Sequence, residues 1–200
     1  QNGYEIFVVT RPGFPHDVMN IEYADVSDKT IDGVHYSHIR LPVRTGVSTA
    51  RFMESIIHVF EKRFREIRPS IVLAASFYIT ALPAIIAARR LGIPVIYELR
   101  GLAEITRMSR DKSYKGSDDY NIRVKMEAET ANAADHVFTL TSSMRDEFIR
   151  RGVDAGKITL LPNSCDEGRF SPQTRDRELA GRLGIGMDVS VIGYIGTIVD

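Results

Sequence analysis

The chain has 200 residues, of which 44% are hydrophobic and 26% charged, as is typical of a globular protein and not of a disordered one. Acidic and basic residues number 26 each, so no overall charge attracts nucleic acid or an anionic membrane. The single cysteine, Cys165, excludes an intrachain disulfide and fits a reducing, cytoplasmic setting. No apolar run reaches the roughly 18 residues that span a bilayer.

Strand and helix patterns alternate along the chain. Apolar runs predict strands at Tyr4–Thr10 and His35–Arg40. Apolar residues then recur at helical spacing from Thr49 to Ile67, and Pro69 ends that helix. The next expected elements are a strand at Ile71–Ala75, a helix at Ile79–Leu91, a strand at Pro94–Tyr97, a helix at Asp119–Ala134, a strand at His136–Leu140, a helix up to Arg151 and a strand at Ile158–Leu161.

Two local features accompany these elements. The polar stretch Ser109–Asp118 is interpreted as a mobile loop. Ser143, with Asp146 three residues later, has the pattern of a capping box and predicts the start of the following helix.

The alternation predicts an α/β fold with a Rossmann-like, mostly parallel sheet and helices on both faces. Ligands of such sheets bind at the carboxyl ends of the strands. This rule selects residues at the ends of four expected strands as candidates for a binding site: Ser76 and Phe77, Glu98 to Gly101, Thr141 to Ser143, and Asn163.

The amino-acid composition of the chain changes after Pro162. Residues 163–188 contain few aliphatic side chains, with a short helix expected at Arg177–Leu183, and resemble an interdomain linker. Val189–Ile195 predicts the first strand of a second α/β domain, which would occupy residues 189–200. We therefore expect residues 1–162 to form the first domain and the chain to be truncated at both ends.

Several familiar site motifs are absent. No G-x-G-x-x-G follows a strand, and the sequence contains no P-loop. The histidines stand apart except for His35 and His38, which we interpret as surface residues of a strand, so no metal site is expected.

Four segments, in a fixed order, carry a family resemblance. Pro162-Asn163-Ser164-Cys165-Asp166, with Phe170 and Pro172, resembles the P-N-G-V-D-x-x-x-F-x-P signature of retaining glycosyltransferases of family 4, also called group 1. Three other segments are similar to further motifs of that family: Ile93–Gly101, Ala134–Ser142 and Val191–Gly196.

The resemblance implies the N-terminal, acceptor-side half of a GT-B fold, in which two Rossmann-like domains face each other across a cleft. It implies transfer of a sugar, with retention of configuration, from a nucleotide-diphosphate sugar to a hydroxyl, in polysaccharide or glycolipid assembly. That sugar is a co-substrate, and no cofactor or metal is expected. By the same alignment the chain lacks the family's first strand, its glycine-rich loop and the two carboxylates of its donor domain.

Arg100 stands where the family often has a histidine facing the cleft. A guanidinium can hold a departing diphosphate in a bidentate manner, so Arg100 is the catalytic candidate, and we expect it to point into the open cleft beside Ser76 and Thr141. The alternative is an arginine that only pairs with Glu98 or Glu104 at the sheet edge. Those two glutamates could bind acceptor hydroxyls, although holding the arginine is the favoured interpretation.

The other candidates follow from the same resemblance and edge rule. The substrate-binding set is Ser76, Glu98, Gly101, Glu104, Thr141, Ser142 and Asn163, and the donor-phosphate set is Gly196 and Thr197. Since the family has Asn-Gly at Asn163-Ser164, we expect a positive φ at one of the two, with Asn163 favoured.

The expected partners are a nucleotide sugar and a glycan or lipid-linked acceptor. Basic residues on or beside the first helix, from Arg51 to Arg68, are expected to form a solvated face, and contact with a membrane-borne acceptor stays open. Two other functions also stay open: a non-catalytic α/β ligand-binding domain and a GT-B nucleotide-sugar epimerase.

Overall fold

The computed structural model describes residues 3–15, 28–39 and 46–196, and the chain divides into two units, Gln1–Pro162 and Asn163–Asp200. The strands are β1 (Phe7–Val9), β2 (Lys29–Ile31), β3 (Val34–Ser37), β4 (Val72–Ala75), β5 (Val95–Leu99), β6 (His136–Thr139) and β7 (Ile158–Leu160). The α-helices are α2 (Thr49–Ile67), α3 (Tyr78–Arg90), α4 (Ala103–Arg110), α5 (Asp118–Ala133), α6 (Ser142–Arg150) and α7 (Arg177–Arg182), and the 3-10 helices are η2 (Lys112–Tyr114) and η3 (Ala155–Lys157).

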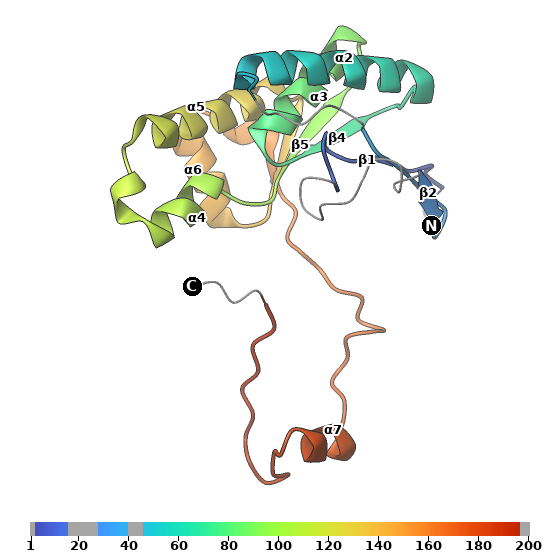
Figure 1. The fold of residues 1–200 in the computed structure, drawn as a ribbon, viewed down its shortest axis with the longest axis vertical. Helices are drawn as coiled ribbons and strands as arrows, with labels where there is room; N and C mark the ends of the chain where they lie inside the picture. The colour runs from blue at the N-terminus through green and yellow to red at the C-terminus, as the bar shows by residue number, and fades with distance from the viewer. Residues whose placement is uncertain (1–2, 16–27, 40–45, 197–200) are drawn as a thin grey trace. The chain divides into compact units, whose positions relative to one another are not determined.

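The first unit contains two sheets among its described residues (Figure 1). The larger has the order β4-β5-β6-β7, and all its strands are parallel, as expected for helices alternating with strands. The smaller has the order β1-β3-β2, with β1 and β3 parallel and β2 antiparallel to β3. The α/β fold is therefore confirmed, while the second sheet and β2 were not predicted.

Helix α2 has the bounds that its sequence pattern predicts. Ser48 is its N-cap, and its hydroxyl accepts a hydrogen bond from Arg51 N. Arg68 ends the helix with a left-handed φ of 52°, directly before Pro69. The buried face of the helix carries Ile56 and Phe60, which pack into the core of the unit.

One face of the larger sheet forms the core. Along β5, Val95, Tyr97 and Leu99 are fully buried, while the residues between them are only half-buried. Val137 continues this buried face on β6, beside Tyr97. This face packs against apolar side chains of α2, α3, α5 and α6, including Phe60, Ile85, Ala131 and Phe148.

The segment expected to be a mobile loop, Ser109–Asp118, instead contains the end of α4, the short helix η2 and the first residue of α5. Asp111 caps η2 by accepting a hydrogen bond from Ser113 N at 3.0 Å. The Tyr114 side chain is buried, its hydroxyl donates to Asp119 at 2.6 Å, and the Arg107 guanidinium lies 4.2 Å from its ring centroid. Arg107 also donates a hydrogen bond to Asp119, 12 residues away. The loop prediction was wrong because such side-chain contacts cannot be recognised from the polar composition of the segment.

The capping box assigned to Ser143 is also wrong. Thr141 is the N-cap of α6, and its Oγ1 accepts a hydrogen bond from Met144 N at 3.2 Å. Strand β6 ends at Thr139, one residue earlier than predicted, so the helix begins at Ser142 and Ser143 lies inside it.

Two expectations for the second unit are contradicted. Asn163 and Ser164 do not have positive φ, since Asp32 and Arg68 are the non-glycine residues with positive φ in the part of the chain that the structure describes. A turn follows later, where Asp166 accepts a hydrogen bond from Gly168 N. Val189–Ile195 does not form a strand, because no described segment pairs with it, and Ile192 is fully exposed.

Candidate functional site

The parallel sheet brings three predicted segments to one edge. Because β4, β5 and β6 run in the same direction and in register, their carboxyl ends are adjacent. Ser76 follows β4, Arg100 follows β5, and Thr141 follows β6. The structure therefore places these candidates at the edge where parallel sheets bind ligands.

Two residues of the predicted substrate-binding set, Ser76 and Glu98, hold Arg100 in place. Its Nη2 lies 2.7 Å from Glu98 Oε2, and its backbone N–H donates to Ser76 Oγ at 2.8 Å. Ser76 in turn donates through its hydroxyl and its backbone N–H to the Glu98 carbonyl, at 3.3 and 3.0 Å. Ser76, directly after β4, and Glu98, in β5, thus fix the backbone and the guanidinium of Arg100 respectively.

The guanidinium remains accessible to a ligand. The Arg100 side chain is 61% exposed, and its bond to Glu98 raises its pKa, so the charge persists at any ordinary pH. A guanidinium has five N–H donors, and among the described residues Glu98 is the partner found for them. A Cβ added to Gly101 would meet nothing within 4 Å, so the space beside the next residue is open. The arrangement can bind an anion with the remaining donors.

The arginine is therefore both exposed and paired. The pairing with Glu98 agrees with the alternative considered for Arg100, and the exposed side chain is accessible to a ligand, as the catalytic interpretation requires. The structure gives no contact between Arg100 and Thr141, and the catalytic role stays a prediction.

Glu104 lies apart from this group. Its side chain is 1% exposed, and its carboxylate is 2.8 Å from the guanidinium of Arg151, which is 5% exposed. Arg151 also pairs with Glu147 at 2.8 Å. Glu104 thus joins α4 to the end of α6 and does not hold Arg100, because Glu98 occupies that position.

The remaining candidates are exposed. Thr141 and Ser142 lie at the N-terminus of α6, where the Thr141 hydroxyl oxygen already caps the helix. Asn163 and Gly196 belong to the second unit, and Thr197 lies outside the described residues.

The sequence analysis missed Glu127 of α5. Its side chain is buried, Oε1 accepts from Tyr78 N at 3.1 Å, and Oε2 accepts from the Tyr97 hydroxyl at 2.5 Å. Burial raises the pKa of the Glu127 carboxyl, and burial together with the negative charge of Glu127 raises that of the Tyr97 hydroxyl. The available signal was the position of Glu127 beside Ala128 and Ala131 on the buried face of the helix.

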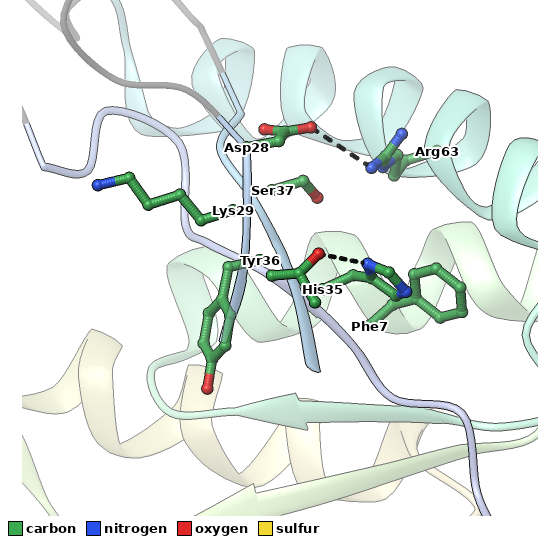
Figure 2. A pocket seen from close by; sticks show the side chains of 8 residues that line it. Phe7, Asp28, Lys29, His35, Tyr36, Ser37 and Arg63 are labelled. Carbon is green, nitrogen blue, oxygen red and sulfur yellow. Dashed lines mark hydrogen bonds and ion pairs between the residues drawn. The ribbon is translucent and has the colours of Figure 1, made fainter. Parts of the chain in front are cut away.

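A separate pocket of about 220 Å³ lies on the smaller sheet (Figure 2). Figure 2 shows the Asp28 carboxylate facing the Arg63 guanidinium, 3.9 Å apart, and Arg63 also pairs with Glu66. His35 stacks on Phe7 and is hydrogen-bonded to the Thr30 hydroxyl, so it is the strand residue that was expected. Asp28 and Glu66 thus neutralise the charge of Arg63. Arg100, Ser76 and Glu98 are not among the residues that line this pocket.

The basic residues of α2 are likewise partly neutralised. Arg65 pairs with Glu61, which also accepts from Arg90. Within residues 3–15, 28–39 and 46–196, no helix is long and apolar enough to cross a membrane, and no cluster of histidine, cysteine and acidic side chains could hold a metal ion.

Comparison with known proteins adds three findings. The family of the glycosyl transferase 4-like domain matches residues 1–164. The D-inositol 3-phosphate glycosyltransferase of Kineococcus radiotolerans is 22% identical over 178 residues, which are 85% of this chain and 40% of that protein. The chain therefore spans about two-fifths of the length of this relative.

Two solved structures are similar to the chain at low sequence identity, and the first of them shares its fold. HepE of Anabaena, in complex with UDP and glucose, superimposes with a TM-score of 0.53 and 14% identity, over 76% of this chain and 38% of HepE. The UDP-GlcNAc 2-epimerase of Neisseria meningitidis, bound to UDP-GlcNAc, gives a TM-score of 0.44 and 14% identity, over 65% of this chain and 39% of the epimerase.

Proposed function

The chain belongs to the glycosyl transferase 4-like family, and from this premise we propose that it forms the acceptor-side part of a glycosyltransferase. The enzyme would transfer a sugar from a nucleotide-diphosphate sugar to an acceptor hydroxyl.

The observation that carries this proposal is the fixed and exposed Arg100 at the carboxyl edge of the parallel sheet. In glycosyl transfer, the bond between the sugar C1 and the diphosphate oxygen breaks, and the nucleoside diphosphate leaves with additional negative charge. A new bond joins C1 to the acceptor oxygen, which loses its proton. A preorganised guanidinium stabilises the leaving diphosphate, and such stabilisation is commonly the largest catalytic contribution.

The local bonds support this role for Arg100. Glu98 uses one edge of the guanidinium and fixes its direction, and Ser76 fixes the backbone on which it stands. The remaining donors need little reorganisation to meet a diphosphate. Ser76 and Glu98, predicted to bind substrate, would then act by positioning Arg100.

Two relatives support the substrate class. HepE has been crystallised with UDP and glucose, and the Kineococcus relative is a glycosyltransferase by name. We extend to this chain a nucleotide-sugar donor and a hydroxyl acceptor on a glycan or lipid-linked molecule. Retention of configuration, a role in polysaccharide or glycolipid assembly and peripheral contact with a membrane are parts of the same proposal.

Product analysis tests the proposal. The longer protein that contains this chain would be incubated with UDP- and GDP-sugars, with and without glycan and lipid-linked acceptors. We expect a new glycoside whose anomeric configuration, measured by NMR, is that of the donor. Conversion of the donor into an epimer without any acceptor would instead identify an epimerase, and binding with no product at all would favour a non-catalytic domain.

A further inference from the structure

Two hydrogen-bonding routes lead from one buried carboxylate to the two segments that hold Arg100. The carboxylate is that of Glu127 on α5, whose side chain is 3% exposed. It accepts one hydrogen bond from the backbone of Tyr78 and another from the hydroxyl of Tyr97.

The first route passes through the turn between β4 and α3. Tyr78 N, at the start of α3, has no acceptor within its own helix, and Phe77, the N-cap, provides no side-chain hydrogen bond to this end of the helix. Glu127 therefore takes the place of a capping side chain and holds the turn that precedes α3. Two residues before Tyr78, the Ser76 hydroxyl accepts the Arg100 N–H at 2.8 Å.

The second route passes through β5 itself. The Tyr97 hydroxyl donates to Glu127 at 2.5 Å, and the Tyr97 side chain is fully buried. Glu98, the next residue on the strand, points to the opposite face and holds the Arg100 guanidinium at 2.7 Å. Ser76 and Glu98, which hold Arg100, thus lie at the ends of β4 and β5, and Glu127 links these two ends through its hydrogen bonds.

A buried carboxylate is costly unless several hydrogen bonds satisfy it, so its presence here calls for a reason beyond packing. We propose that Glu127 is a positioning residue that aligns the ends of β4 and β5 and thereby sets the place of Arg100. The catalytic consequence rests on the proposed function, whereas the structural consequence does not.

Amide hydrogen exchange, followed by NMR on the 200-residue chain, tests the structural part without any sugar donor. Glu127→Leu removes both acceptors while keeping a side chain of similar size. The exchange of the Tyr78 and Arg100 amides should accelerate by about 10-fold or more, as expected for local opening. The Leu161 amide donates to Thr139 O at 2.8 Å at the same carboxyl edge, but between β6 and β7, neither of which accepts or donates a hydrogen bond to Glu127. Its exchange should not change, and it serves as the internal reference.

Two further variants sharpen the comparison. Glu129→Gln alters an exposed glutamate two residues away on the same helix and should leave all three amides unchanged. Glu127→Gln keeps one acceptor oxygen. It should accelerate exchange at the same two amides, Tyr78 and Arg100, but by a smaller factor than Glu127→Leu. Unchanged exchange at Arg100, or an equal acceleration at Leu161, overturns the proposal, because Glu127 would then be a local cap or a general core residue.

A double-mutant cycle in the longer protein tests the catalytic part. Glu127→Gln should lower kcat by about 10-fold when Arg100 is present and have no further effect in the Arg100→Ala background, since Glu127 acts through Arg100. Equal effects in both backgrounds would overturn this part. If no sugar transfer occurs at all, the proposed function fails while the exchange result still decides the role of Glu127.

Discussion

Arg100 combines a fixed position with an exposed charge. Its exposed fraction of 61% leaves it accessible, while Glu98 and Ser76 determine where it points. The carboxyl-edge rule predicted Arg100 and Ser76 as neighbours from the sequence, because each follows an adjacent parallel strand. Pairing with Glu98 was the alternative interpretation, and the expected contact with Thr141 is not found among the residues that the structure describes. The rule could not predict Glu127, because this residue acts from a helix whose contact with β5 spans 30 positions.

The exposure of Arg100 leads to a prediction for stability. Arg100→Ala should change the free energy of unfolding by no more than about 0.5 kcal/mol, since an exposed ion pair contributes little. Urea denaturation of the 200-residue chain measures this. A substantially lower midpoint would mean that Arg100 is a structural ion-pair partner and not a site residue.

Glu127 leads to a prediction for pH. Burial raises the pKa of its carboxyl in the folded state, so the folded state binds its proton more tightly than the unfolded state does. This contribution to stability is complete below the ordinary pKa of 4.5 and is lost as pH rises through the raised pKa. The free energy of unfolding of the wild type, minus that of Glu127→Gln, should therefore decrease from about pH 4 to about pH 8.

The matched control for this measurement is Glu129→Gln. The free energy of unfolding of the wild type, minus that of Glu129→Gln, should show no comparable decrease with pH. The groups near Glu127 that could also respond are Tyr97, Glu104 and Arg151. If the difference in free energy of unfolding between the wild type and Glu127→Gln increased with pH, the pKa of Glu127 would be lowered and not raised.

Helix α4 shows how buried charges determine the arrangement of elements. It follows Arg100 directly and is joined to the end of α6 by Glu104 and Arg151, both nearly inaccessible to solvent. Neither the helix nor this pair was predicted. Leu102, the N-cap of α4, makes no side-chain hydrogen bond, so the sequence contains no start signal there.

Removing one member of this pair should destabilise the fold. Glu104→Leu leaves the guanidinium of Arg151 without one of its two carboxylates and should cost about 3–5 kcal/mol in the free energy of unfolding. The double variant Glu104→Leu with Arg151→Leu should lose clearly less than the sum of the two single variants. Urea denaturation of the four proteins gives the coupling, and additive losses would show that the pair is not coupled.

Other elements illustrate which sequence signals were sufficient. The apolar spacing of α2, with Pro69 after it, predicted its bounds correctly. Strand β2 was missed although Asp32 and Gly33, with φ of 51° and 81°, form the two-residue turn that an Asp-Gly pair favours between antiparallel strands. Val189–Ile195 has the composition of a strand, but a strand also requires a partner, and no described segment provides one.

At the scale of the whole molecule, the chain corresponds to only part of the proteins that it resembles. The chain spans 40% of its Kineococcus relative and 38% of HepE. The family resemblance assigns most of the donor site to the C-terminal domain of a GT-B enzyme. Arg100 alone would therefore supply only part of the contacts to a nucleotide sugar.

This division predicts weak donor binding by the 200-residue chain. Calorimetry with a panel of nucleotide sugars should give a Kd well above about 1 μM, a level that requires roughly 8 kcal/mol of binding free energy. Sub-micromolar binding of any donor would show that these residues form a complete donor site.

The most direct test of the central claim is the turnover of the longer enzyme with Arg100 altered. Arg100→Ala should lower kcat by about 10²-fold or more, the usual scale for losing one preorganised charge stabiliser, and Arg100→Lys should recover only part of this loss because an ammonium is not bidentate. Arg65→Ala is the matched control, since its side chain is 60% exposed and also pairs with a glutamate, and it should leave kcat unchanged. Equal turnover in the wild type and Arg100→Ala would contradict the assignment of Arg100 to the leaving diphosphate.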